Sequence, residues 1–363
     1  MHSVLLRFAA LMWTTIAQLE FEPEALGERR YLESNEERCR FCAEDPAGRT
    51  FDKDAHAFPA ALGNRYVLTR EECDGCNERG SSLENDLAAH LTTTRVMSRI
   101  PGRNGDVKHR YGNRPSSIAS DGANNRLVVR RDMGDDSLVT RRTRDGVRYI
   151  FKIPAYRPMN VIRALARVAL MLVPAAELRD LDHIRRFVRD ELQWASPSFD
   201  EAFIPGTGLR RVRIEVDKNG DSTPGEALYR VGVSYGTSIL VLHMPGPDMV
   251  LVRIPPPPSN LRSPYPPHEV KWRRVSVRRD EVFRGRKDQV DVFVPALAAQ
   301  PPPTHDEIAV AAYYRWLARV GSGQPGSAVD DWVEGEQDLL WLLVPTEAVA
   351  ERAANQTGSE AVA

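Results

Sequence analysis

Hydrophobic residues recur with a helical period in the middle of the chain and with a strand-like period after residue 209. Between Met159 and Val173, apolar side chains repeat every three or four positions, which predicts an amphipathic helix. A second helix is predicted from Pro174 to Trp194. Beyond it, four apolar runs separated by turn residues predict an antiparallel β-meander. These runs are Leu209–Val216, Leu228–Tyr235, Thr237–Met244 and Asp248–Ile254.

The first 32 residues are predicted to be helical, because Val4–Leu19 is almost entirely apolar. This run is shorter than the ~20 apolar residues that a membrane-spanning helix needs, and it contains Arg7. It also lacks a small-residue cleavage site followed by a clear mature start. We therefore expect neither a membrane segment nor an export signal.

The pattern divides the chain into parts of different character. A helix is expected over Ser81–Leu91, and short β-like runs separated by Asp-Gly turns lie between residues 126 and 153. The prolines at 301–303 precede a last helical region. We predict an α+β fold with an N-terminal helical segment (1–32), a cysteine-containing domain (33–95), an α+β accessory domain with the β-meander (96–298) and a C-terminal two-helix module (304–345).

Charge is distributed unevenly, although 49 basic and 50 acidic residues nearly cancel. Residues 95–157 carry 15 basic and 6 acidic side chains, and residues 271–287 carry 8 and 2, whereas residues 1–94 carry 10 and 17. Lys and Arg side chains dominate nucleic-acid affinity because they neutralise phosphates. The two basic segments are therefore candidates for phosphate contact. The alternative is that they form solvated surfaces without a ligand. The hydrophobic share of 42% excludes a disordered chain and a polytopic membrane protein.

The four cysteines form two CxxC pairs, Cys39 with Cys42 and Cys73 with Cys76. Each pair directs two thiolates at one point, and two such pairs complete the tetrahedron that structural Zn²⁺ prefers. Two disulfides or free thiols are the alternatives, and a reducing compartment disfavours disulfides. We expect bound zinc and a cytoplasmic protein.

The residues around the cysteines resemble the HNH endonucleases, which have a zinc-bound ββα-metal core. The resemblance covers about Glu37–Leu91 and consists of CRFC from Cys39, DAHAFPAALGN from Asp54 and CDGCN ending at Asn77. It implies a metal-dependent endonuclease that hydrolyses phosphodiester bonds, with double-stranded DNA as its partner. It also implies Mg²⁺ or another divalent cation for catalysis beside the structural zinc.

The resemblance assigns a role to each matching residue. His56 would be the general base that activates water, and Asn77 would help to hold the catalytic cation. Asn64 would orient the histidine or would be a turn residue, and Asp54 would be the nearest carboxylate ligand of the cation. Ala55 separates Asp54 from His56, where the family commonly places a ligand directly before the histidine. Because Asp54 and His56 are two positions apart on an extended strand, both side chains can face one site.

The last region, 304–345, resembles a short bacterial helical module of unknown function that could dock a protein partner. Its Trp316 and Trp332 would pack the two helices together. A different function also fits the cysteine segment. It could be a catalytically inactive zinc-binding module that binds nucleic acid or protein.

Overall fold

The computed structural model describes the chain in separate stretches. They are residues 13–23, 28–32, 38–98, 108–110, 116–121, 126–130, 138–143, 146–203, 209–220, 222–249, 271–283 and 289–295, and then 305, 308–309, 312–313, 316, 319, 327–329 and 331–332.

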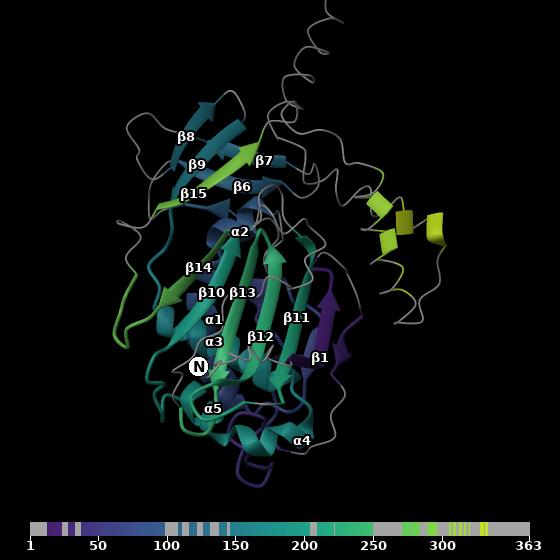
Figure 1. Cartoon of the computed structure of the whole chain (residues 1–363), viewed down its shortest axis with the longest axis vertical. Helices are drawn as coiled ribbons and strands as arrows, with labels where there is room; N and C mark the ends of the chain where they lie inside the picture. Colours follow the sequence, from purple (N-terminus) through teal and green to yellow (C-terminus); the bar gives the residue numbers. More distant parts are fainter. Residues whose placement is uncertain are drawn as a thin grey trace, which may run out of the picture.

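A six-stranded antiparallel sheet is the largest element of the fold (Figure 1). Its strand order is β1-β11-β12-β13-β10-β14. The strands are β1 (Trp13–Phe21), β10 (Ser198–Phe203), β11 (Leu209–Asn219), β12 (Ala227–Gly236), β13 (Ser238–Pro245) and β14 (Lys271–Ser276).

The predicted meander is confirmed for its first three strands, because β11, β12 and β13 pair in sequence order. Most of the fourth predicted run, Asp248–Ile254, lies outside the described residues. The meander does not stand alone, because β1 and β10 flank it on either side. Neither flanking strand was predicted from the pattern.

The helix predicted for residues 1–32 is wrong where the structure describes this segment. Trp13–Phe21 is a β-strand that pairs with β11, and Arg30–Tyr31 forms the short strand β2. The β-branched residues Thr14, Thr15 and Ile16 favour a strand, and the open edge of β11 supplies a partner for its backbone. Residues 1–12 lie outside the described part of the chain.

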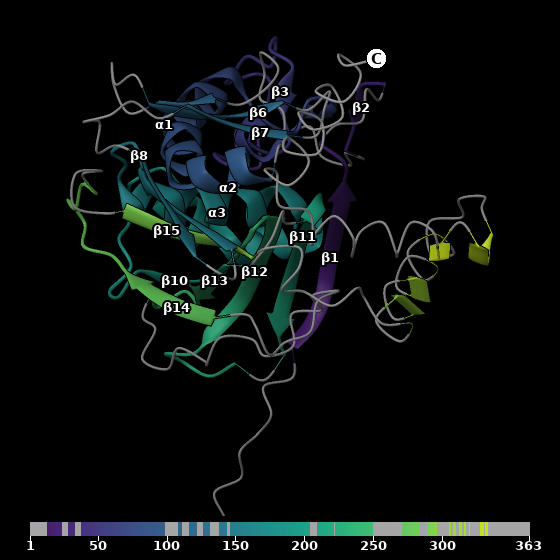
Figure 2. The same cartoon turned by 90° about the horizontal axis from the view of Figure 1, so that it is seen from above.

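Helix α3 (Pro158–Leu172) confirms the predicted central helix and is buried over almost its whole length. It packs against strands of the large sheet on one side and against helix α1 (Asp74–His90) on the other. Figure 2 shows these layers from above, with the helices on one face of the sheet. A helix between two layers has no solvent face, so its few polar side chains need partners inside the protein.

The second predicted helix, Pro174–Trp194, is interrupted. It consists of α4 (Ala175–Leu178), the 3-10 turn η2 (Arg179–Leu181) and α5 (Asp182–Val188). Residues 189–194 are not helical, and Asp190 has a positive φ of 66°. The chain turns there toward β10, which places Arg189 and Asp190 beside α3.

Three smaller sheets complete the described fold. One contains β8 (Leu138–Thr143), β9 (Gly146–Lys152) and β15 (Gln289–Pro295), and a second contains β5 (Lys108–His109), β6 (Ser117–Asp121) and β7 (Arg126–Arg130). The third contains β2, β3 (Ala55–His56) and β4 (Val67–Thr69). It is linked to the 3-10 turn η1 (Ala60–Leu62), α1 and α2 (Thr92–Met97), and it carries the candidate site.

The cysteine segment shares its hydrophobic core with the rest of the protein. One cluster of buried side chains includes Cys73 and Phe58 together with Leu165 of α3 and Tyr229 of β12. Tyr235 of β12 also donates a hydrogen bond to the Ala61 carbonyl at 3.0 Å. The residues predicted to be a nuclease domain are therefore packed as part of a larger body.

Buried His243 is predicted to make the sheet sensitive to acid. Burial, together with the positive charges of Arg230 and Arg274, lowers the pKa of His243 to about 3. A histidine in the unfolded chain titrates near ~6.5, so the unfolded state binds an extra proton in the window between these values. Stability therefore falls as the pH drops through that window, by about 2 kcal/mol between pH 7 and pH 5. Urea unfolding of wild type and His243→Leu at both pH values should show a smaller decrease for the variant; equal decreases would contradict the prediction.

Candidate metal centre

The four cysteine sulfurs converge, although they come from two segments that are 30 residues apart in the sequence. All four Sγ atoms lie within 4.8 Å of one another, and none is in a disulfide. The Sγ atoms of Cys42 and Cys73 are 3.8 Å apart. A zinc–sulfur distance of ~2.3 Å gives a tetrahedron with edges of about 3.8 Å. The cluster can therefore hold a metal ion such as zinc, with Cys39, Cys42, Cys73 and Cys76 as ligands.

Local backbone structure sets the position of each sulfur. Cys39 and Cys42 lie on a tight turn that Ala43 closes, with its N–H 2.8 Å from the Cys39 carbonyl and a φ of 61°. Cys73 is the N-cap of α1, and Cys76 is in its first turn. The Cys73 N–H is 3.5 Å from the Cys39 Sγ, and Arg79 Nη2 is 3.6 Å from the Cys76 Sγ. Such donors stabilise thiolate sulfur.

Four thiols at this separation cannot all ionise without a cation. A hydrogen bond from Cys76 lowers the pKa of Cys39 to about 5, and the same contact raises the pKa of Cys76. Burial raises the pKa of Cys42 to about 11. A bound divalent cation offsets both the burial and the mutual repulsion, because the ligands bind as thiolates and release their protons.

Buried arginines hold the first cysteine turn against the helices. Arg40, between the two cysteines, forms an ion pair with Glu71 and donates hydrogen bonds to the Leu170 and Val173 carbonyls at the end of α3. Arg185 of α5 donates to the Arg40 carbonyl at 2.7 Å. The Arg40 guanidinium thus satisfies buried carbonyls at the α3 C-terminus, where positive charge is favourable.

A second buried arginine holds the other cysteine pair. Arg167 of α3 forms ion pairs with Glu72, which precedes Cys73, and with Glu84 of α1. The Arg167 and Glu72 side chains are 5% and 0% exposed, so each charge depends on the other. The sequence pattern alone did not predict these contacts of Arg167. Arginines at 163 and 167 in an otherwise apolar helix were the available signal for these contacts.

Gly80 of α1 makes room for this arginine, and Gly80→Ala is predicted to destabilise the protein. A Cβ at position 80 would lie 2.6 Å from the Arg167 Cζ and 2.9 Å from its Nε. Alanine in a helix interior normally gains about 1 kcal/mol over glycine, but here it would displace a buried ion pair whose disruption costs about 3–5 kcal/mol.

Gly75 of the same helix is the matched control, because a Cβ there meets nothing within 4 Å. Urea unfolding should show a lower midpoint for Gly80→Ala and an equal or higher midpoint for Gly75→Ala. A stabilised Gly80→Ala protein would show that Arg167 does not need this space.

His56 ends the short strand β3 and faces its neighbour β4 in a fixed register. It pairs with Leu68, and the next residue, Ala57, donates a backbone hydrogen bond to Val67 at 3.0 Å. The His56 side chain is partly buried. The ring is therefore carried by an edge strand whose backbone is held in register by β4.

Asn64 is buried and closes the loop that leads from β3 to β4. Its Nδ2 donates to the carbonyls of Phe58 at 3.0 Å and Val67 at 2.9 Å, and its Oδ1 accepts from the Val67 N–H at 3.0 Å. Both donor hydrogens are engaged by the backbone. Any influence of Asn64 on His56 must therefore pass through the loop that it braces.

Asp54 makes contacts on the side of β2. Its two carboxylate oxygens accept hydrogen bonds from Arg29 Nη1 and from the Tyr31 hydroxyl, both at 2.9 Å. The hydrogen bond to Asp54 raises the pKa of Tyr31. A cation ligand at Asp54 would have to compete with both donors.

Asn77 lies in the first turn of α1, one residue after Cys76, and its side chain is partly buried. Within the described parts of the chain, the four cysteines form the only group of three or more His, Cys, Asp and Glu side chains placed to share a metal ion. His56 is not a member of that group, and Asn77 is the amide that the resemblance assigns beside it.

The His90 side chain of α1 is mostly covered and has partners. Its Nε2 is 3.1 Å from Glu201 and its Nδ1 is 3.0 Å from the Tyr156 hydroxyl. The ring also packs edge-on against Phe199. His90 therefore joins α1 to the large sheet through β10.

The C-terminal region is described at a few positions only. The described residues between 305 and 319 are all helical. Arg319 forms an ion pair with Asp331 at 2.7 Å, Trp332 contacts His305, and Trp316 stacks on Tyr313. The arginine and aspartate thus link the two helical stretches. None of the helices in the described residues is long and apolar enough to cross a lipid bilayer.

Comparison with known proteins identifies a family only for this last region. Residues 303–340 match a family described as a protein of unknown function (DUF2934). The match supports the resemblance noted for residues 304–345 and does not include the cysteine cluster. No curated protein and no solved structure matches the chain.

Proposed function

We propose that this protein is a metal-dependent HNH endonuclease that hydrolyses phosphodiester bonds of DNA, with His56 as the general base. The observation that supports this proposal is the order of elements around His56. Antiparallel strands β3 and β4 are followed directly by α1, and the four-cysteine cluster ties the start of α1 to the preceding turn. This is the order of a zinc-bound ββα core, with the histidine at the end of its first strand.

In this proposal the cysteines and the histidine have separate tasks. Zn²⁺ at the cysteines is structural, because all four positions of its tetrahedron are filled by sulfur. Neutral His56 accepts a proton from the attacking water. Asn64 keeps the β3–β4 loop closed, so that the histidine is held in place on its strand.

Catalysis also requires a second divalent cation in this proposal, for which Mg²⁺ is the first candidate. Asn77 would help to hold it, together with oxygens of the substrate, while His56 stays free to accept the proton. When bound, the cation would stabilise the negative charge that develops on the phosphate. Asp54 would contribute only if Arg29 and Tyr31 released its carboxylate.

The engagement of Asp54 favours a second candidate function. With its carboxylate bound by Arg29 and Tyr31, the segment would be a zinc-binding module that binds nucleic acid or protein without cutting. The four-cysteine cluster fits this binding function as well as it fits the nuclease function. Both candidates fit a reducing compartment such as the cytoplasm, which keeps the four thiols available for metal.

Incubation of purified protein with supercoiled plasmid DNA distinguishes the two functions. Parallel reactions contain Mg²⁺, Mn²⁺, Ni²⁺ or EDTA, and agarose gels report nicked and linear products. The endonuclease is expected to convert the plasmid with at least one cation and not with EDTA. Retardation of the plasmid without any conversion would favour the binding module.

A further inference from the structure

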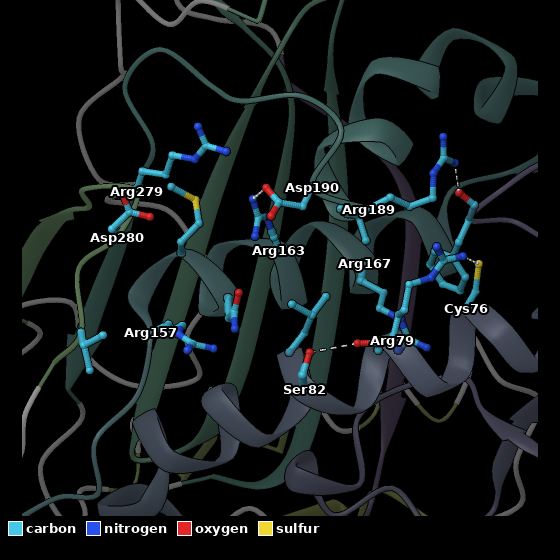
Figure 3. Close-up of a pocket in the computed structure, with 17 residues that line it drawn as sticks. Cys76, Arg79, Ser82, Arg157, Arg163, Arg167, Arg189, Asp190, Arg279 and Asp280 are labelled. Atoms are coloured by element: carbon cyan, nitrogen blue, oxygen red, sulfur yellow. Dashed lines mark hydrogen bonds and ion pairs between the residues drawn. The ribbon is translucent and has the colours of Figure 1, made fainter.

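A pocket of about 600 Å³ lies between α1, α3, the end of α5 and the segment that follows β14 (Figure 3). Six arginines line it, against two acidic residues, Asp190 and Asp280. The arginines are Arg79, Arg157, Arg163, Arg167, Arg189 and Arg279. His56 and Asn77 are not among the lining residues, so the pocket is separate from the proposed catalytic site.

Structural ion pairs explain half of these arginines. Arg167 is bound by Glu72 and Glu84, Arg163 by Asp190, and Arg189 by Glu191. The remaining three, Arg79, Arg157 and Arg279, are exposed and form no ion pair with a described carboxylate, although Arg79 donates a hydrogen bond to the Cys76 Sγ at 3.6 Å. They come from α1, from the N-cap of α3 and from the segment after β14, so three distant stretches of sequence bring positive charge to one place.

A buried donor in the pocket also lacks a partner. The Arg163 side chain is 9% exposed, and its Nε makes no hydrogen bond to the described residues. Burial lowers the pKa of Arg163, and the nearby positive charge of Arg279 lowers it further, against the effect of Asp190. The two arginines thus repel each other in a partly dehydrated place, and an anion between them would relieve that repulsion.

The start of α3 adds to the positive potential. Arg157 is its N-cap, and Met159 and Asn160 of the first turn line the pocket. The N-terminus of a 15-residue helix carries a partial positive charge, which favours an anion near it. Ser82 and Asn160 supply neutral polar groups beside the arginines, and Leu83 and Val188 supply apolar surface.

We propose that this pocket binds a small ligand that carries two or more linked phosphate groups, such as a nucleoside diphosphate or triphosphate. Guanidinium groups bind phosphate oxygens in pairs, and several of them converge here from different elements. The volume is in the range of small-molecule sites and is large enough for more than a single phosphate. This proposal does not depend on the nuclease activity.

Titration calorimetry of the zinc-loaded protein with pyrophosphate and with ATP, in EDTA-free buffer without added Mg²⁺, tests the site. Both probes are expected to bind at one site per chain and to compete. Arg157→Gln combined with Arg279→Gln should weaken both by at least about 100-fold, because each charge-assisted hydrogen bond contributes about tenfold or more. The removed side chains are exposed, so the thermal unfolding midpoint should not change.

Arg179→Gln combined with Arg278→Gln is the matched control. Both residues are exposed, neither lines the pocket, and the loss of charge is the same. This control should bind both probes as wild type does. An equal loss in the two double variants, or no binding of either probe, would overturn the proposal. Binding of a 12-nucleotide single strand alone would assign the arginines to a nucleic-acid backbone and would also overturn it.

Discussion

Removal of the zinc that we expect at the four-cysteine cluster should unfold residues 38–98 and should destabilise the protein more than Gly80→Ala does. Three of the sulfurs belong to the main hydrophobic core, which also includes Phe41 and Leu87. In the variant Cys73→Ser the remaining sulfurs would keep their burial without a complete ligand set. Structural zinc contributes ~10 kcal/mol or more to the folding of small modules at neutral pH.

Plasma emission spectrometry and thermal unfolding check this expectation. Wild type should contain one zinc per chain, and Cys73→Ser should contain little and should unfold at a much lower temperature. Ser81→Ala is the control, because it removes one oxygen atom from an exposed position of the same helix. A wild-type protein without zinc, or a Cys73→Ser protein with an unchanged midpoint, would contradict a structural role for the metal.

The buried arginines Arg40 and Arg167 determine whether unfolding of residues 38–98 also disturbs α3. Arg40 and Arg167 join the two cysteine turns to α3 independently of the metal. Without metal, the two cysteine turns are less ordered, so the ion pairs of Arg40 and Arg167 become more exposed to water. The packing of α1 on α3 then weakens too. We therefore expect the loss of metal to lower the cooperativity of unfolding as well as its midpoint.

The sequence predicted the parts of this fold that depend on local pattern. The helical period of α3 and the alternating pattern of β11, β12 and β13 were sufficient to predict these elements, because each element buries its own apolar residues. Strand β1 was missed because an apolar run of its length fits a helix as well as a strand. Only the long-range partner β11, almost two hundred residues away, decides between them.

The candidate site was also predictable only where it depends on local sequence. The spacing of Cys39, Cys42, Cys73 and Cys76 was enough to place four sulfurs together, because metal ligation is specified by residue type and interval. The contacts of Asp54 could not be predicted from the sequence, because they depend on where β2 places Tyr31. The arginine pocket was also missed, since its members are spread over 201 positions, from 79 to 279, and only the tertiary fold collects them.

Replacement of His56 by alanine is expected to abolish most of the DNA cleavage while leaving zinc content and fold intact. A positioned general base contributes about 10²–10⁴-fold to such a reaction, and water has no other assigned acceptor for its proton in the proposed site. His56 is not one of the four sulfur ligands, and the backbone bonds of β3 with β4 do not involve its ring.

Two further variants make this test specific. Asp52→Asn changes an exposed side chain four residues away and should cut plasmid DNA as wild type does. Added imidazole should restore part of the activity of His56→Ala, because it supplies the missing base, and should not affect the wild type. Full activity of His56→Ala would show that another group activates water. If wild-type protein binds the plasmid with every cation and cuts with none, the cysteine segment acts as the zinc-binding module, and His56 contributes to its packing on β4 instead of to chemistry.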